Sequence, residues 1–124
     1  MTGKARVLIV LSCCLFLAAC TSGTHRQAQA LLSRYGWTTT GRGTTHWVTL
    51  PQSFEHRPGQ FPIPIYWAYD NELSKAIGLD LSPYLGQRVE TTVYELEEEL
   101  PEFLYPYTRA RAVVVTHDGE IIGA

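Results

Sequence analysis

The chain has 124 residues, of which 45% are hydrophobic and 18% are charged. A chain of this length supports one domain with one hydrophobic core and is too short for two. The formal net charge is −2, and no segment carries a basic stripe, so the composition argues against a nucleic-acid partner.

The N-terminus has the features of a bacterial export signal. Lys4 and Arg6 supply its positive charges, and Val7–Phe16 is an apolar run. This run is shorter than the ~20 residues that a helix needs to cross a bilayer. The next four residues, Leu17–Cys20 with the sequence LAAC, resemble the bacterial lipobox, whose cysteine receives a diacylglyceryl group. We therefore expect a lipoprotein signal peptide; the alternative is a chance cysteine that ends a plain signal peptide or an N-terminal membrane anchor.

The lipobox predicts where the mature chain begins and where it is located. Cleavage is expected between Ala19 and Cys20, so that the lipid on Cys20 holds the domain at the outer, extracytoplasmic face of the cytoplasmic membrane. Cleavage removes Cys13 and Cys14, which leaves no disulfide, so the hydrophobic core alone must hold the domain together. The net charge falls from −2 to −4 because two basic residues are lost with the signal. An acidic domain is not expected to be drawn further onto an anionic membrane surface.

The predicted organisation is a signal peptide over 1–19, a lipidated linker over 20–24 and a single domain over 25–124. Periodicity and turn residues predict a helix over 24–36, a strand over 46–50, a helix from just past Pro64 to Gly78, and strands over 87–97, 109–117 and 120–123. Helices and strands are segregated, in the order α-β-α-β-β-β. This order predicts an α+β fold, a small antiparallel sheet of about four strands with two helices packed on one face.

The first helix carries signals at both ends. Thr24 and Gln27 have the spacing of a capping box, and Gly36 is placed to end the helix. Its apolar residues share one face, namely Ala28, Leu31, Leu32 and Tyr35. The glycine- and threonine-rich segment 38–45 follows and is interpreted as a flexible surface loop, because its GRG lacks the spacing and the lysine of a phosphate loop.

The second helix and the last two strands have similarly clear patterns. The helix places one row of residues on a predicted core-facing side, namely Tyr66, Tyr69, Leu73, Ala76 and Ile77. Ala112–Val115 is apolar on both faces, which predicts a central strand. Asp118 and Gly119 predict a tight hairpin turn of type I′ between the last two strands.

Two blocks of the mature chain resemble a known family. They are GLDLSPYLGQRVETTVYEL, Gly78–Leu96, and AVVVTHDGEIIG, Ala112–Gly123, supported by YGW at the end of the first helix. They resemble domain-of-unknown-function family 4830, found in exported proteins and lipoproteins of Gram-positive, often spore-forming, bacteria. The resemblance implies no catalytic residue, because the family has no assigned activity. Relatives are expected to have more chain after the final strand, so a sequence that stops at Ala124 is expected to be either a shortened family member or a trimmed sequence.

The residues that could carry chemistry do not form a recognisable catalytic or metal motif. The four histidines, His25, His46, His56 and His117, lack metal-site spacing, and neither a metal nor a cofactor is expected. Glu55 beside His56 is the nearest candidate pair, and Asp70 and Glu72 should diverge on their helix. An acidic cluster, Glu95, Glu97, Glu98, Glu99 and Glu102, is interpreted as solvated, with weak cation or basic-partner binding as the alternative.

The aromatic and proline-rich segment Phe61–Tyr69 is the strongest candidate for binding. Part of it is expected in the core, and the remainder forms a candidate partner surface made of Phe61, Tyr66, Trp67 and Tyr105. The sequence thus favours a lipid-anchored envelope protein that is no enzyme and binds another envelope protein or a cell-wall component. The alternatives are an envelope enzyme or its auxiliary subunit, and a sensor in a sporulation or stress pathway.

Overall fold

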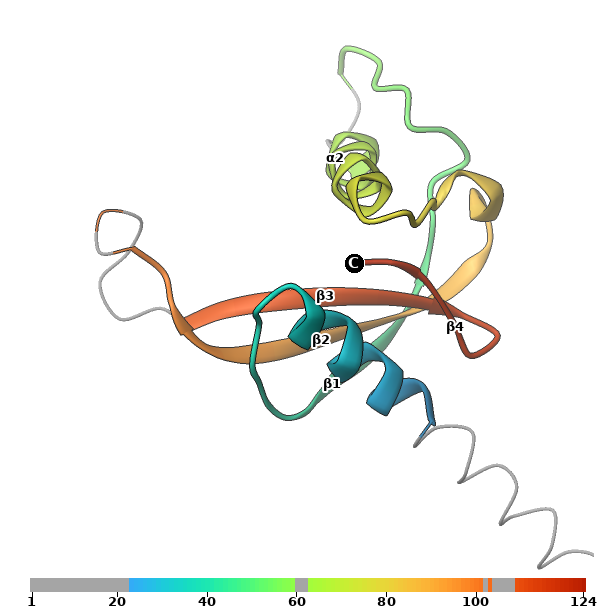
Figure 1. The fold of residues 1–124 in the computed structure, drawn as a ribbon. Helices are drawn as coiled ribbons and strands as arrows, with labels where there is room; N and C mark the ends of the chain where they lie inside the picture. Colours follow the sequence, from blue (N-terminus) through green and yellow to red (C-terminus); the bar gives the residue numbers. More distant parts are fainter. Residues whose placement is uncertain (1–22, 60–62, 102, 104–108) are drawn as a thin grey trace, which may run out of the picture.

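A computed structural model describes residues 23–59, 63–101, 103 and 109–124 of the chain, and Figure 1 shows their arrangement. The described part of an N-terminal helix covers 23–34. The other elements follow as β1 (Thr39–Thr49), α2 (Ile63–Ala76), a short 3-10 helix (Ser82–Tyr84), β2 (Arg88–Glu99), β3 (Arg109–His117) and β4 (Glu120–Gly123). The strands form one antiparallel sheet in the order β1-β2-β3-β4. The α+β class, the four strands and the element order are confirmed.

The interior position of β3 follows from its apolar run. β3 pairs with β2 on one side and with β4 on the other, so the predicted central strand is confirmed. Val114 and Val115 lie on opposite faces of β3 and both are buried, with 1% and 0% of their surface exposed. The hairpin to β4 turns at Asp118 and Gly119, whose φ angles of 49° and 80° are the pair of positive values that a type I′ turn requires.

The segment 38–45 is not the flexible loop that its composition suggested, because most of it belongs to β1. The register passes from Thr40 opposite Glu95 to Thr44 opposite Val93, which leaves a bulge over 41–43. Gly43 lies at the tightest point, where a Cβ atom would approach the carbonyl oxygen of Val93 to 2.8 Å. The glycines are therefore those of a β-bulge within a strand.

The sheet is covered on both faces, which corrects the expectation of two helices on one face. In the first cluster, Trp67 of α2 packs with Leu81, Val89 and Val115. In the second, Ala28 and Leu32 of the N-terminal helix pack with Tyr94 and Val114. Adjacent strand residues point to opposite faces, so the clusters at Val114 and Val115 lie on opposite sides of β3. Figure 1 shows α2 above the sheet and the N-terminal helix in front of it.

The N-terminal helix ends where the sequence predicts, but Thr24 lies inside the helix and is not its N-cap. Residue 23 is already helical, and the Thr24 hydroxyl donates to the carbonyl oxygen of Gly119 at 3.4 Å. Thr24 therefore links the helix to the β3–β4 turn. At the other end, the backbone N–H of Trp37 donates to the carbonyl oxygen of Leu32 at 3.0 Å, which closes the helix around Gly36.

Candidate functional site

Helix α2 presents to the core the side opposite to the one predicted. Its buried residues are Trp67, Asn71 and Ser74. Tyr66, Tyr69 and Leu73 were expected in the core, but 53%, 67% and 49% of their surfaces are exposed. Ile65 is exposed beside them. We call Ile65, Tyr66, Tyr69 and Leu73 the outer row of α2.

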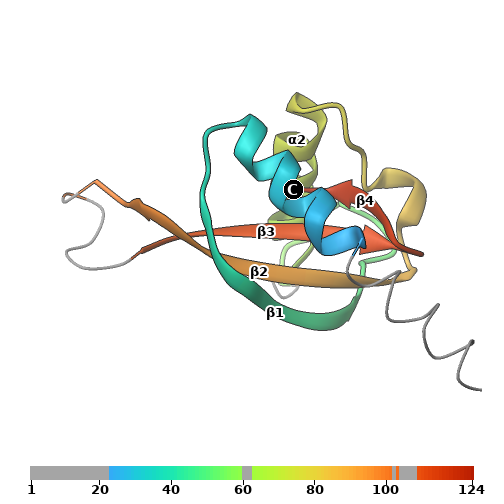
Figure 2. The same cartoon turned by 60° about the horizontal axis from the view of Figure 1, so that its bottom comes forward.

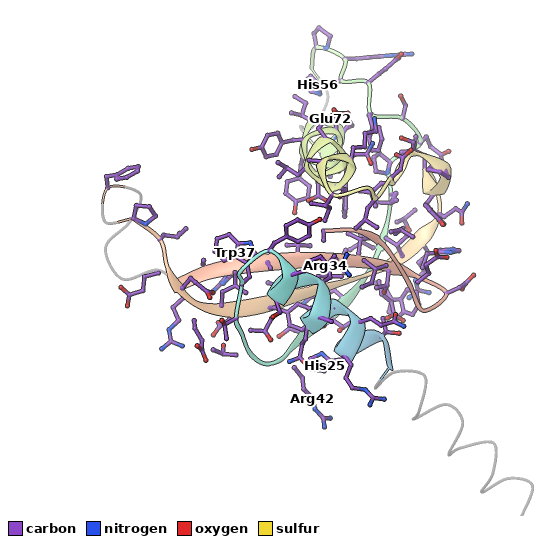
Figure 3. The ribbon with its side chains drawn as sticks, viewed as in Figure 1. His25, Arg34, Trp37, Arg42, His56 and Glu72 are labelled. Carbon is purple, nitrogen blue, oxygen red and sulfur yellow. The ribbon has the colours of Figure 1, made fainter. Side chains whose placement is uncertain are left out.

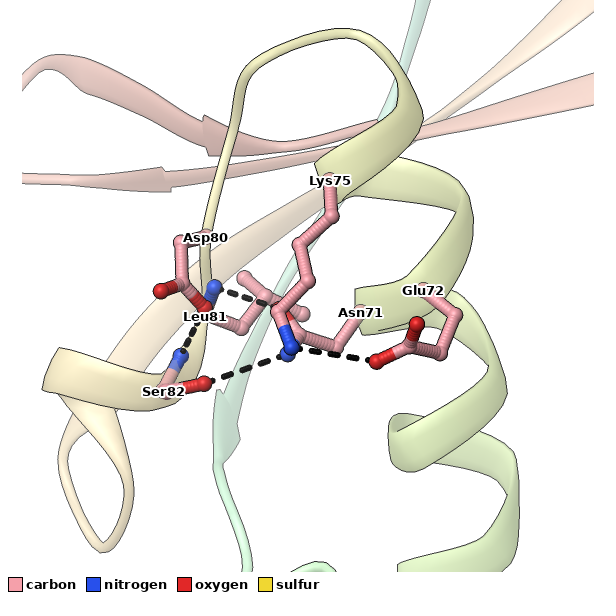
Figure 4. A network of polar contacts seen from close by, with 6 residues as sticks. All are labelled: Asn71, Glu72, Lys75, Asp80, Leu81 and Ser82. Carbon is pink, nitrogen blue, oxygen red and sulfur yellow. Dashed lines mark hydrogen bonds and ion pairs between the residues drawn. The ribbon is translucent and has the colours of Figure 1, made fainter.

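Hydrogen bonds explain why α2 buries polar residues. The side-chain oxygen of Asn71 accepts the backbone N–H of Leu81 at 2.7 Å, and its amide nitrogen donates to the Ser82 hydroxyl at 3.2 Å (Figure 4). Both groups of the Asn71 amide are therefore satisfied in a buried position. Next to it, the Asp80 carboxylate accepts the Ser82 N–H at 2.9 Å, and hydrogen bonds from Ser82 lower the pKa of Asp80. This arrangement gives the block at Gly78–Gly86 a structural role.

A second polar contact fixes α2 against the end of the sheet. The Ser74 hydroxyl lies 3.3 Å from the carbonyl oxygen of Ala124, to which it donates, and it accepts the Ala124 N–H at 3.1 Å. Gly123 packs so closely here that a Cβ atom would approach Leu81 Cδ2 to 2.7 Å. The helix is thus held with one orientation, and the outer row is directed away from the core.

The predicted partner surface is only partly retained. Tyr66 is exposed, as that surface requires. Trp67 is a core residue with 5% of its surface exposed, and its ring meets that of Tyr66 edge-on at 5.3 Å. Phe61 and Tyr105 lie outside the described residues, as do Ala19 and Cys20. Tyr69 and Leu73 are surface residues that the sequence does not reveal, because their regular spacing resembles that of a core face.

Asp70 lies at the border between the outer row and the buried side of α2. Its Oδ2 atom is buried and has no hydrogen-bond partner among the described residues. Burial raises the pKa of Asp70. The pKa of Tyr66, one helical turn away, is also raised, first by burial and then by the negative charge of Asp70. The border of the outer row therefore contains a carboxylate that is costly to keep charged.

The remaining candidates stay separate from one another. Figure 3 shows His56 near α2 and His25 on the N-terminal helix, at opposite ends of the molecule. His25 stacks on Tyr94 with ring centroids 5.5 Å apart, and His117 packs against Tyr84 at 5.0 Å. In the part of the chain that the structure describes, no three His, Cys, Asp or Glu side chains converge on a common point.

Two further features, a surface depression and the acidic cluster, are candidate sites. A shallow depression of about 250 Å³ is lined by Pro51, Gln52, Ser53, Glu55, Arg57 and Pro64. It contains Glu55, but His56 is not among its lining residues, so the predicted Glu-His pair does not converge there. In the acidic cluster, the Glu98 carboxylate accepts the Thr38 N–H at 2.9 and 3.1 Å. Glu98 thereby joins β2 to the segment that leads into β1.

Comparison with known proteins identifies a family for this chain. The family model described as domain of unknown function DUF4830 matches residues 31–124. No curated protein and no solved structure is significantly similar to the chain. Over the residues that the structure describes, no helix combines the length and the apolar character that crossing a membrane requires.

Proposed function

The chain belongs to the DUF4830 family, and we propose that it is a lipid-anchored interaction module of the cell envelope, without enzymatic activity. The observation that carries this proposal is the outer row of α2. Large apolar side chains at this spacing stabilise a domain when they face its core. Here they face solvent, because Trp67, Asn71 and Ser74 occupy the core side of the helix.

The outer row has the composition of a protein-binding surface. Tyrosine is enriched at the energetically dominant positions of interfaces, because it buries a large ring and keeps a polar tip. Tyr66, Tyr69 and Leu73 follow one another at the three- and four-residue spacing with which a helix engages an apolar groove. The partner that fits is another envelope protein with an apolar groove.

The position of the expected lipid fits this role. Cys20 precedes Gly23 by three residues, which span at most about 10 Å of extended chain. A lipid on Cys20 would thus lie close to the N-terminal helix, whereas α2 covers the opposite face of the sheet. Anchoring through Cys20 would direct the outer row away from the membrane, where a partner can reach it.

Anchoring is tested by labelling cells with a radioactive fatty acid. The unchanged chain should become labelled and processed, and Cys20→Ala should remain an unlabelled, uncleaved precursor. Equal labelling of Cys20→Ala would refute lipidation at this residue.

Binding is tested with a photo-crosslinking amino acid placed singly at Tyr69 or Leu73 in intact cells. We expect both positions to give an adduct of the same mass. The matched control is Tyr35, an exposed tyrosine of the N-terminal helix with 49% of its surface accessible. Absence of an adduct from the outer row, or an equal yield at Tyr35, would refute the proposed docking surface. The enzyme and sensor alternatives gain no specific support from the described residues.

A further inference from the structure

Strand β1 forms an edge of the sheet, as Figure 2 shows. Its second half, Thr44–Thr49, pairs with β2 in an unbroken register, and the bulge is confined to 41–43. An edge strand has hydrogen-bonding groups on its outer side that the sheet does not use. The outer side of Thr44–Thr49 is therefore available for pairing with another strand.

The hydrogen bonds at the end of β1 show which residues point outward. The Leu50 N–H donates to the carbonyl oxygen of Gln87 at 2.9 Å, so the backbone of Leu50 points toward β2. Backbone direction alternates along a strand, so the residues at odd positions point the other way. These are Thr45, Trp47 and Thr49, whose outward N–H and C=O groups have no partner among the described residues.

Among the residues that the structure describes, this segment lacks the features that normally protect an edge strand. Protection comes from lysine, from proline, from bulges or from a covering element. The sequence TTHWVT contains neither lysine nor proline, and the side chains of Thr45, Trp47 and Thr49 are exposed. The second cluster places the N-terminal helix over β2, β3 and β4 through Tyr94, Val114 and Ile121, and includes no residue of β1. Trp47 is 57% exposed and has the Arg88 guanidinium 4.8 Å from its ring centre.

We propose that two copies of the chain pair antiparallel through β1, with Trp47 on the two-fold axis. In this register Trp47 faces Trp47 of the second copy, and Thr45 faces Thr49. Every outward N–H and C=O of these three residues then finds a partner, whereas a shift in either direction leaves some unpaired. The segment complements itself, because aromatic pairs and threonine pairs are favourable across strands and no two like formal charges face each other.

The symmetry of this pairing allows both copies to be anchored in the same membrane. The two-fold axis of an antiparallel strand pair stands perpendicular to the sheet, so the same face of both copies points to the same side. Both N-terminal helices would lie on that side, and both outer rows of α2 on the other. This step rests on the proposed anchoring at Cys20, whereas the strand pairing itself does not. Two anchored copies would also have a raised effective concentration.

The pairing is tested by disulfide trapping in the full-length chain in isolated membranes. Trp47→Cys places two thiols at the axis, where the paired Cα atoms should lie about 5.5 Å apart and a disulfide can form. We expect mild oxidation to give a crosslinked dimer. A reductant should convert this dimer back to the monomer. The control is Trp37→Cys, an exposed tryptophan outside β1 that should remain monomeric. A monomeric Trp47→Cys chain, or equal crosslinking of Trp37→Cys, would overturn the proposal.

Two further variants test the register and the role of the backbone. Coexpressed Thr45→Cys and Thr49→Cys chains should crosslink with each other more than either does with itself. Thr45→Pro, added to Trp47→Cys, removes an outward N–H that β2 does not use, and should lower the crosslinked fraction by roughly tenfold. An unchanged fraction, or a reversed pairing preference, would contradict the pairing through β1. The unsubstituted chain gives the background from Cys13, Cys14 and Cys20.

The failure of this proposal is distinguishable from that of the proposed function. Fatty-acid labelling reports the anchor, the photo-adduct at Tyr69 reports the outer row, and the Trp47→Cys disulfide reports the edge. A purified chain that carries both Cys20→Ala and Trp47→Cys should still form the crosslinked dimer at high protein concentration. Loss of crosslinking there, with the fold intact by circular dichroism, would refute the strand pairing alone.

Discussion

The N-terminal helix and α2 both carry apolar residues at helical spacing, but they use them in opposite ways. The N-terminal helix buries Ala28 and Leu32 of its row, which are exposed by only 1% and 6%, although Tyr35, at the end of the helix and expected on the same face, is 49% exposed. Helix α2 exposes its row at Tyr69 and Leu73 and buries Asn71. Apolar spacing thus identifies a helix in both cases, but it identifies the buried side in only one.

The difference lies in what each helix meets. The N-terminal helix packs on an apolar patch at Tyr94 and Val114, so its own apolar residues decide its orientation. Helix α2 meets an irregular segment whose backbone needs partners, and Asn71 supplies one to the Leu81 N–H. A buried backbone group without a partner is costly, so the hydrogen bonds made by α2 can outweigh the gain from burying its tyrosines.

The largest effect on stability should come from replacing Trp67, the one large aromatic residue that α2 buries. Trp67→Ala should lower the free energy of unfolding by about 3–5 kcal/mol, because it leaves a cavity among core residues. Tyr69→Ala, on the outer row, should change it by less than about 0.5 kcal/mol. Urea denaturation of both variants checks this difference, and Trp67→Phe gives a milder core variant. Similar losses for the two alanine variants would contradict the orientation of α2.

Two leucines make the comparison between the helices direct. Leu32→Ala should destabilise the domain by about 2–4 kcal/mol, since Leu32 is packed in the second cluster. Leu73→Ala removes the same atoms from an exposed site and should cost less than about 0.5 kcal/mol. Unfolding midpoints in urea at constant m-value report both effects. If Leu73→Ala lowered the free energy of unfolding as much as Leu32→Ala, the outer row would be covered by the chain itself.

A smaller effect is expected from the polar side of α2. Asn71→Ala should lower stability by about 1–3 kcal/mol, because it leaves the buried Leu81 N–H without an acceptor. Its neighbour Glu72 makes an exposed ion pair with Lys75 at 3.0 Å, so Glu72→Ala should cost only about 0.3–0.5 kcal/mol. The two are compared by urea denaturation. Equal losses would mean that the Asn71 hydrogen bonds do not determine how α2 packs.

The strands near the end of the chain were predicted from local chemistry. The bounds of β3 and β4 agree with those read from the sequence, since an apolar run and an Asp-Gly turn specify them without distant contacts. The first half of β1 could not be predicted in this way. Its threonines and glycines have no strand pattern of their own, and they become a strand because β2 is long enough to pair with them around the bulge.

Tertiary contacts also decide the features of the candidate site that the sequence prediction missed. The buried position of Trp67 and the exposure of Tyr69 depend on which side of α2 faces Leu81, a residue outside the helix. The covering of both sheet faces depends in the same way on how the chain crosses from β1 to β2. The signal available in the sequence was Asn71, a polar residue in the middle of an otherwise amphipathic helix.

The smallest expected effect concerns Asp70, which lies between the two sides of α2. Its raised pKa means that the folded domain disfavours the charged carboxylate, so folding binds protons between the unfolded and folded pKa values. The domain therefore gains stability from Asp70 as the pH falls through this window, and loses it as the pH rises above the ordinary aspartate value. Asp70→Asn should be more stable than the unchanged chain at pH 7, and this advantage should shrink toward pH 3. Urea denaturation at both pH values measures it, with the exposed Glu72→Gln as control. An advantage that is equal at the two pH values would show that the charge of Asp70 is not its cause.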